Sequence, residues 1–65
     1  MQDTNTSEWL KLSELIAMLS MSRDLILRLV NEGQFPRPVR FSRKFVRWDS
    51  QEVQNWIYQQ EQSRI

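Results

Sequence analysis

Apolar residues recur at helical spacing in two short segments in the first half of the chain. The first segment carries them at Leu12, Leu15, Ile16 and Leu19. This spacing predicts a short helix over residues 13–19, with Ser13 as its N-cap. Glu14 then lies in the first turn, where the helix dipole favours an anion.

The second segment begins after Ser22, which is a favoured N-cap residue. Its inward stripe consists of Ile26, Leu29 and Val30. Gly33 stands where a left-handed C-cap is needed, and Pro36 follows soon after, so we expect a helix over residues 23–32. Two short helices joined by a tight turn are a helix-turn-helix candidate, although such pairs also occur in proteins that bind no DNA.

Apolar and polar positions then alternate, as they do in a strand. Residues 39–41 and 45–48 predict a small β-hairpin. Alternation places four side chains toward the core, namely Val39, Phe41, Val46 and Trp48. Arg40 and Arg47 are then expected to point outward, whereas the side taken by Phe45 stays open because it breaks strict alternation.

A last apolar stripe predicts a third helix that begins after Asp49 and ends near Gln59. Asp49 is a favoured N-cap, and Glu52 stands where a capping box requires a carboxylate. The stripe consists of Val53, Trp56 and Ile57. The chain is therefore expected to be mainly α with a small β-hairpin, in the order that a winged helix-turn-helix requires.

A chain of 65 residues allows one domain, which we expect over residues 8–59, with tails at 1–7 and 60–65. Without Cys, such a small domain depends on its aromatic residues for much of its core. Trp48 and Trp56 are expected in that core, with base stacking as the alternative. Trp9 is expected to pack as a staple against the first helix, with an exposed contact as the alternative.

The positive charges are concentrated in the predicted hairpin and the segment that leads to it. Although the net charge is only +1, five of the nine cations lie between residues 36 and 48, where no acidic residue occurs. They are Arg37, Arg40, Arg43, Lys44 and Arg47. A solvated surface is the ordinary explanation of such a run, but beside a helix-turn-helix these cations favour a DNA-binding wing.

The second helix presents a polar face opposite its apolar stripe. That face includes Asp24, and the expected recognition set is Ser22, Arg23, Leu27, Arg28 and Asn31. Arg can bond guanine and Asn can bond adenine in the major groove. The same residue types also form ordinary solvated faces, and it is the neighbouring basic hairpin that favours base recognition.

The sequence offers no catalytic or metal-binding arrangement. His and Cys are absent, and a single glycine cannot form a glycine-rich phosphate loop. No apolar run has the length of a membrane span or a signal-peptide core. We therefore expect a cytoplasmic, non-enzymatic protein that uses no cofactor, metal ion or small-molecule ligand.

Several motifs resemble the AlpA family of small phage and prophage regulators, which belong with the MerR-like winged helices and phage excisionases. They are Leu19-Ser20-Met21-Ser22-Arg23, Gly33-x-Phe35-Pro36-x-Pro38-Val39, Val46-Arg47-Trp48 and Glu52-Val53-x-x-Trp56-Ile57. The resemblance covers residues 10–59. The chain departs from the family where Gly is common at Ser20, Thr at Leu25, Tyr at Leu27, and Gly-Pro or Gly-x at Ser42-Arg43.

The resemblance implies a second helix in a major groove of double-stranded DNA and a wing at the backbone or the minor groove. It also implies a role in transcriptional control, prophage excision or both. Carried over by position, Arg23 and Arg28 fall on the recognition helix, and Arg43, Lys44 and Arg47 fall in or beside the wing.

One module of this size buries little surface, so we expect cooperative self-association on DNA or a partner such as an integrase or RNA polymerase. Two other functions stay open. The chain could be a protein-interaction module with Leu27, Phe45 and Trp9 as anchors, or it could bind single strands or RNA through exposed aromatic rings.

Overall fold

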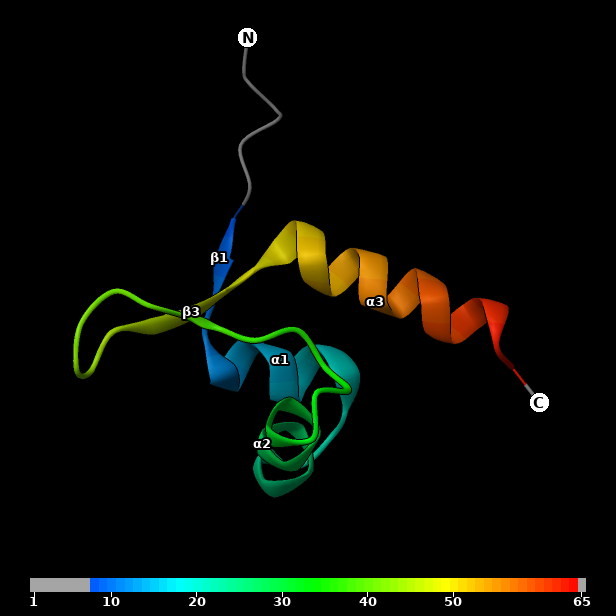
Figure 1. Ribbon diagram of the computed structural model, residues 1–65, viewed down its shortest axis with the longest axis horizontal. Helices are drawn as coiled ribbons and strands as arrows, with labels where there is room; N and C mark the ends of the chain where they lie inside the picture. Colours follow the sequence, from blue (N-terminus) through cyan, green and yellow to red (C-terminus); the bar gives the residue numbers. More distant parts are fainter. Residues whose placement is uncertain (1–7, 65) are drawn as a thin grey trace, which may run out of the picture.

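The computed structural model describes residues 8–64, and the expected tail at residues 1–7 lies outside this range. Its elements are β1 (Trp9–Leu10), α1 (Leu12–Leu19), α2 (Arg23–Asn31), β2 (Val39–Arg40), β3 (Val46–Asp49) and α3 (Ser50–Gln62). Figure 1 shows α1 and α2 on one side of the strands, a hairpin that projects from the body, and α3 beyond the end of β3. This is the winged helix-turn-helix fold that the sequence predicted.

Helix α1 begins one residue earlier than expected. Lys11 occupies the N-cap position, and its backbone N–H donates to the carboxylate of Glu14 at 2.7 Å. The prediction of Ser13 as the cap was wrong because strand β1 continues up to Leu10, so the chain passes directly from strand to helix. The helix ends at Ser20, whose φ of 54° lies in the left-handed region that favours glycine.

Both ends of α2 follow the predicted local signals. The Ser22 hydroxyl accepts a hydrogen bond from the Leu25 N–H at 3.1 Å. At the other end Gly33 has a φ of 74°, and its N–H donates to Val30 O while the next N–H, of Gln34, donates to Leu29 O. These two bonds form a Schellman motif, which ends the helix at Asn31 rather than at residue 32.

The sheet has three antiparallel strands in the order β1-β3-β2, so β3 is the central strand. Trp9 pairs with Asp49 and Leu10 pairs with Trp48. The pairing continues through Ser50, whose N–H donates to Glu8 O at 2.9 Å. Strand β1 was not predicted, because two residues are too few to display an alternating pattern.

The core lies where the two helix-turn-helix helices, the sheet and α3 meet. It consists of Leu15, Ile26, Phe35, Trp48 and Val53. Burial of Trp48 was predicted, whereas Trp56 is half-buried and Phe35, in the loop after α2, is an additional core residue. The Trp56 ring lies edge-to-face on Phe35 with ring centroids 4.7 Å apart.

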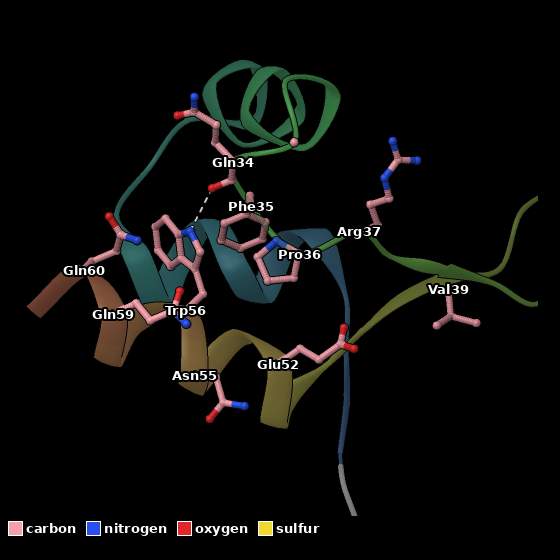
Figure 2. A pocket seen from close by; sticks show the side chains of 11 residues that line it. Gln34, Phe35, Pro36, Arg37, Val39, Glu52, Asn55, Trp56, Gln59 and Gln60 are labelled. Atoms are coloured by element: carbon pink, nitrogen blue, oxygen red, sulfur yellow. Dashed lines mark hydrogen bonds between the residues drawn. The ribbon is translucent and has the colours of Figure 1, made fainter. Parts of the chain in front are cut away.

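Two indole hydrogen bonds attach the loop after α2 to the rest of the domain. The Trp48 Nε1–H donates to Pro36 O at 2.8 Å. The Trp56 Nε1–H donates to Gln34 O at 2.8 Å, as Figure 2 shows. Helix α3 begins at the predicted cap, with the Asp49 carboxylate accepting from the Gln51 N–H, but the expected capping box with Glu52 does not form. The helix continues past the expected end at Gln59. The two indole hydrogen bonds fix the position of α2 relative to β3 and α3.

Candidate nucleic-acid interface

Helix α2 separates an inward apolar face from an outward polar face. Ile26 is fully buried, and Leu29 and Val30 are half-buried. The predicted recognition residues are all exposed, namely Ser22, Arg23, Leu27, Arg28 and Asn31. Leu27 is 38% exposed, so an apolar side chain is available on this face beside donors and acceptors. The structure therefore brings the predicted helix set together on one accessible surface.

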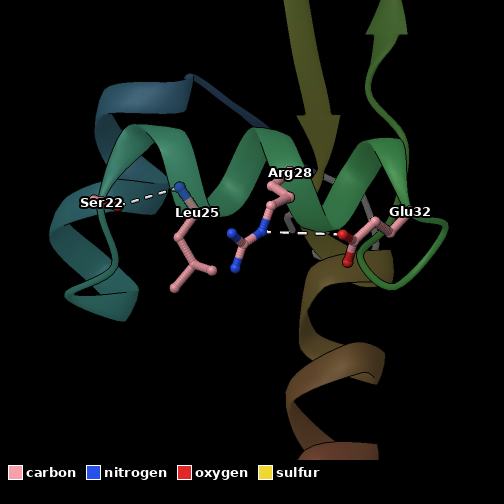
Figure 3. A network of polar contacts seen from close by, with 4 residues as sticks. All are labelled: Ser22, Leu25, Arg28 and Glu32. Atoms are coloured by element: carbon pink, nitrogen blue, oxygen red, sulfur yellow. Dashed lines mark hydrogen bonds and ion pairs between the residues drawn. The ribbon is translucent and has the colours of Figure 1, made fainter.

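An ion pair on this face was not anticipated from the sequence. Arg28 Nε lies 4.0 Å from a carboxylate oxygen of Glu32, and the two side chains are 68% and 52% exposed (Figure 3). Pairs this exposed contribute about 0.2–1 kcal/mol, so Arg28 can leave Glu32 at little cost. The i,i+4 spacing of the two residues was the signal that could have revealed the pair.

The hairpin of β2, β3 and the residues between them, here called the wing, projects away from the helices (Figure 1). Its turn is closed by hydrogen bonds from the Phe41 N–H to Phe45 O at 2.8 Å and from the Phe45 N–H to Ser42 O at 3.2 Å. Arg43 and Lys44 therefore lie at its tip, fully accessible to a ligand.

The predicted wing cations fall into two groups. Arg40 and Arg47 take part in the structure of the wing, since Arg40 Nη1 donates to Arg43 O at 3.3 Å and the Arg47 guanidinium lies 3.9 Å from the centroid of the Phe45 ring. Arg37, Arg43 and Lys44 are exposed, and within residues 8–64 none of the five wing cations has a carboxylate at ion-pair distance. Their positive charge is thus uncompensated locally.

Two apolar residues of the wing face the opposite way from the prediction. Val39 and Phe41 are 40% and 50% exposed, and Val39 pairs with Arg47 while Arg40 pairs with Val46. Cross-strand partners share a face of the sheet. Val39 therefore lies on the outer face. The expectation that Arg40 points outward was wrong for the same reason, because Arg40 lies on the core side, beyond the edge of the core.

The prediction that Val39 and Phe41 point inward was wrong because register is set by the turn, and a slip of one residue exchanges the two faces of a strand. Val46 and Trp48 do face the core as predicted, with Val46 half-buried. Trp9 does not act as a staple: it lies in β1, is 46% exposed, and contacts the ring of Phe41.

An open hollow of about 830 Å³ lies between the loop after α2 and α3 (Figure 2). Its polar lining consists of the amides of Gln34, Asn55, Gln59 and Gln60 together with Arg37 and Glu52. Within the described part of the chain, no group of three or more Asp, Glu, His or Cys residues could hold a metal ion. Among the helices of residues 8–64, none is both long enough and apolar enough to cross a membrane.

Comparison with known proteins gives one match. The family model described as prophage CP4-57 regulatory protein (AlpA) matches residues 8–62, which is most of the chain. No curated protein and no solved structure matches the chain. The matched segment begins one residue before β1 and ends with α3, so it includes every helix and strand described above.

Proposed function

We propose that this chain, which belongs to the AlpA family of phage regulatory proteins, binds double-stranded DNA sequence-specifically and controls transcription, prophage excision or both. Helix α2 would enter the major groove, and the wing would contact the backbone or the minor groove. The observation that carries the proposal is the pairing of an exposed Arg- and Asn-bearing helix with a projecting hairpin whose cations are uncompensated.

The proposed base contacts come from the outward face of α2. Arg23, Arg28 and Asn31 carry the side chains that bond guanine or adenine edges, and Leu27 offers a methyl-rich surface that suits the methyl group of thymine. Ser22 keeps its hydroxyl proton available as a donor, because its oxygen accepts the Leu25 N–H. The buried Ile26 holds this face in a fixed orientation.

The proposed phosphate contacts come from the wing and from Arg37. Each cation that neutralises a phosphate releases condensed counterions, so the affinity falls steeply with salt. Such contacts position a protein on DNA without reading its sequence. The two surfaces would then divide the work, with α2 selecting the site and the wing supplying most of the salt-dependent affinity.

A single small module gives limited affinity, because single DNA-binding modules bury about 600–1,000 Å² of protein surface. We therefore propose that several copies occupy adjacent sites cooperatively, or that a second DNA-bound protein such as an integrase or RNA polymerase adds contacts. Titration of duplexes that carry one site and then several sites distinguishes independent from cooperative occupation.

The test is enrichment of bound duplexes from a randomised pool, followed by affinity measurements over a salt series for the enriched and for a scrambled duplex. We expect one enriched motif and a linear fall of log affinity with log salt for both duplexes. Enrichment without any motif would leave only non-specific binding. Failure to retain duplex DNA at low salt would reject the proposal altogether.

A further inference from the structure

The outer face of the sheet carries an aromatic surface whose rings take no part in the proposed DNA contacts. We call it the aromatic face, and it consists of Trp9, Val39, Phe41, Phe45 and Arg47. Its four apolar side chains are 46%, 40%, 50% and 47% exposed in that order. Single exposed apolar residues are ordinary, but a contiguous set on one face marks an interaction site.

The rings of this face contact one another. Trp9 and Phe41 meet edge to face with centroids 5.1 Å apart and planes at 89°, and Phe41 and Phe45 meet with centroids 5.6 Å apart and planes at 61°. The Arg47 guanidinium covers the Phe45 ring at 3.9 Å from its centroid. The surface is therefore pre-formed, and a ligand would not have to order it on binding.

Charge indicates which ligand suits the aromatic face. Arg47 lies within it, and Arg43 and Lys44 lie at its outer end. The acids near its other end are Glu8 and Asp49, and the Asp49 carboxylate already accepts the Gln51 N–H at the start of α3. A partner with carboxylates beside the wing end would thus meet three cations.

The small extent of the face limits the size of the partner. It offers five side chains, whereas a standard interface between folded proteins uses about 20–30 residues on each side. A short segment of a partner fits this area better than a folded domain. A second copy placed face to face with the two wings side by side is disfavoured, because it would bring Arg47 and the two tip cations of each copy against those of the other. The antiparallel arrangement is a separate outcome of the test below.

The ring geometry also argues against stacked nucleobases. Base stacking needs open ring faces that lie parallel to successive bases. Here the rings stand at 89° and 61° to their neighbours, and one face of Phe45 is covered by Arg47. These rings form the wall of a shallow apolar surface, into which an aliphatic or aromatic anchor can pack.

We propose that the aromatic face docks a short acidic segment of a partner protein, with an apolar anchor on the rings and its carboxylates at Arg47 and the wing tip. This contact goes beyond DNA binding. Because the same wing cations are proposed to meet phosphates, the acidic segment would compete with the backbone contact of the wing. The contact does not depend on which base sequence α2 selects.

The probe is a synthetic peptide of Asp and Glu residues with a central Leu-Trp anchor, titrated into the isotope-labelled protein and followed by NMR. Two further peptides keep the length but replace the acids by Lys or the anchor by Ser. The indole N–H of Trp9 is a direct reporter, because those of Trp48 and Trp56 are bonded to backbone carbonyls inside the domain. Signals of Trp9, Phe41, Phe45 and Arg47 should shift with the first peptide only.

The variants separate this face from the rest of the surface. The double substitution Phe41→Ser and Phe45→Ser should lower the affinity for the acidic peptide about tenfold or more, as expected for anchor residues. Arg47→Glu should lower it by a similar factor. The matched controls are Tyr58→Ser, an aromatic residue 62% exposed on α3, and the exposed Arg64→Glu, which should leave binding unchanged. Scrambled-duplex binding by the double Phe variant should be retained, which keeps this test separate from that of DNA binding.

Five outcomes would overturn the proposal. The acidic peptide does not bind, or it binds equally with Lys in place of its acids. Face signals shift on dilution alone, so a second copy occupies the face. Oligothymidylate shifts the face signals and is lost with the Phe substitutions, so the rings stack bases. Duplex DNA shifts them as strongly as it shifts Arg43 and Lys44, so the face belongs to the DNA contact.

Discussion

Helix α2 and the wing both present cations, but different interactions hold the two regions in place. In α2 the cations stand on a helix that is capped at Ser22, ended at Gly33, and held by the fully buried Ile26. In the wing, residues 39–45 are all exposed, and the first half-buried residue is Val46. The tip is shaped by backbone hydrogen bonds and by contacts between side chains.

This difference suits the two kinds of contact proposed for DNA. Base edges must be met with fixed geometry, which a packed helix supplies, whereas phosphates accept a cation from a range of positions. The helix also holds Asp24 and Glu32 near its cations, while the wing holds no acid between residues 37 and 48. Mixed charge on the helix and uniform charge on the wing therefore predict different responses to substitution and to salt.

The largest effect is expected at Trp48, whose packing supports both regions. Trp48 is 2% exposed and bonds Pro36 O in the loop that follows α2, so Trp48→Ala should lower the free energy of unfolding by about 3–5 kcal/mol. That is enough to unfold much of a domain this small. Urea denaturation is the measurement, and Trp9→Ala is the exposed control that should cost far less. Equal costs for the two substitutions would contradict the described core.

The next effect tests selection by the helix. Arg28→Ala should weaken the enriched duplex by about 1–3 kcal/mol and relax base preference at one position, because Arg28 stands on the outward face of α2. Affinities for duplexes that vary at each position give the result. Arg64→Ala, on an exposed residue outside both surfaces, is the control. A uniform loss on all duplexes would assign Arg28 to a phosphate instead.

A third prediction addresses the N-cap of helix α2. Ser22→Ala removes the acceptor of the Leu25 N–H and should lower the free energy of unfolding by about 0.5–2 kcal/mol. Ser13→Ala is the matched control, because Ser13 lies inside α1 and does not cap it. Thermal or urea unfolding of both variants decides the matter. Unchanged stability in the Ser22 variant would mean that the cap contributes nothing.

A fourth prediction concerns the wing tip. Arg43→Ala or Lys44→Ala should weaken enriched and scrambled duplexes by similar factors and lower the slope of log affinity against log salt by about 1. Stability should stay unchanged, since both side chains are exposed. A wing variant with the full salt slope, together with uniform loss in the Arg28 variant, would reverse the proposed division between helix and wing.

The smallest expected effect is a gain. Glu32→Gln removes the carboxylate that pairs with Arg28. Because the exposed pair contributes only about 0.2–1 kcal/mol, DNA affinity should rise within that range while stability changes little. Glu61→Gln, at the far end of α3, is the control and should leave DNA affinity unchanged. A weaker complex would show that Glu32 orients Arg28 usefully.

The features predicted correctly from the sequence have local causes. Ser22 and Gly33 set the ends of α2 through bonds to residues a few positions away, and Asp49 does the same for α3. Exposure of Arg37, Arg40, Arg43 and Lys44 was also predictable, because an unpaired charge is costly to bury. These signals can be recognised without knowledge of the tertiary structure.

The features that were missed depend on residues distant in sequence. The position of the α1 cap depends on strand β1, which exists only because Trp9 and Leu10 pair with β3. The outward orientation of Val39 and Phe41 depends on hairpin register, and burial of Phe35 depends on its contact with Trp56. The aromatic face could not be foreseen for the same reason, because its members come from three strands and from the turn between β2 and β3.

The hydrogen bond between Trp48 and Pro36 has a consequence for the DNA as well as for the protein. It joins the loop that follows α2 to β3, the central strand of the sheet and one strand of the wing, so the span between the two proposed contact surfaces is set before binding. Because the protein keeps this span fixed, a duplex that contacts both surfaces must bend or change its groove width to fit. Because that deformation costs less for some base steps than for others, a fixed span discriminates among sequences at base pairs that the protein never touches.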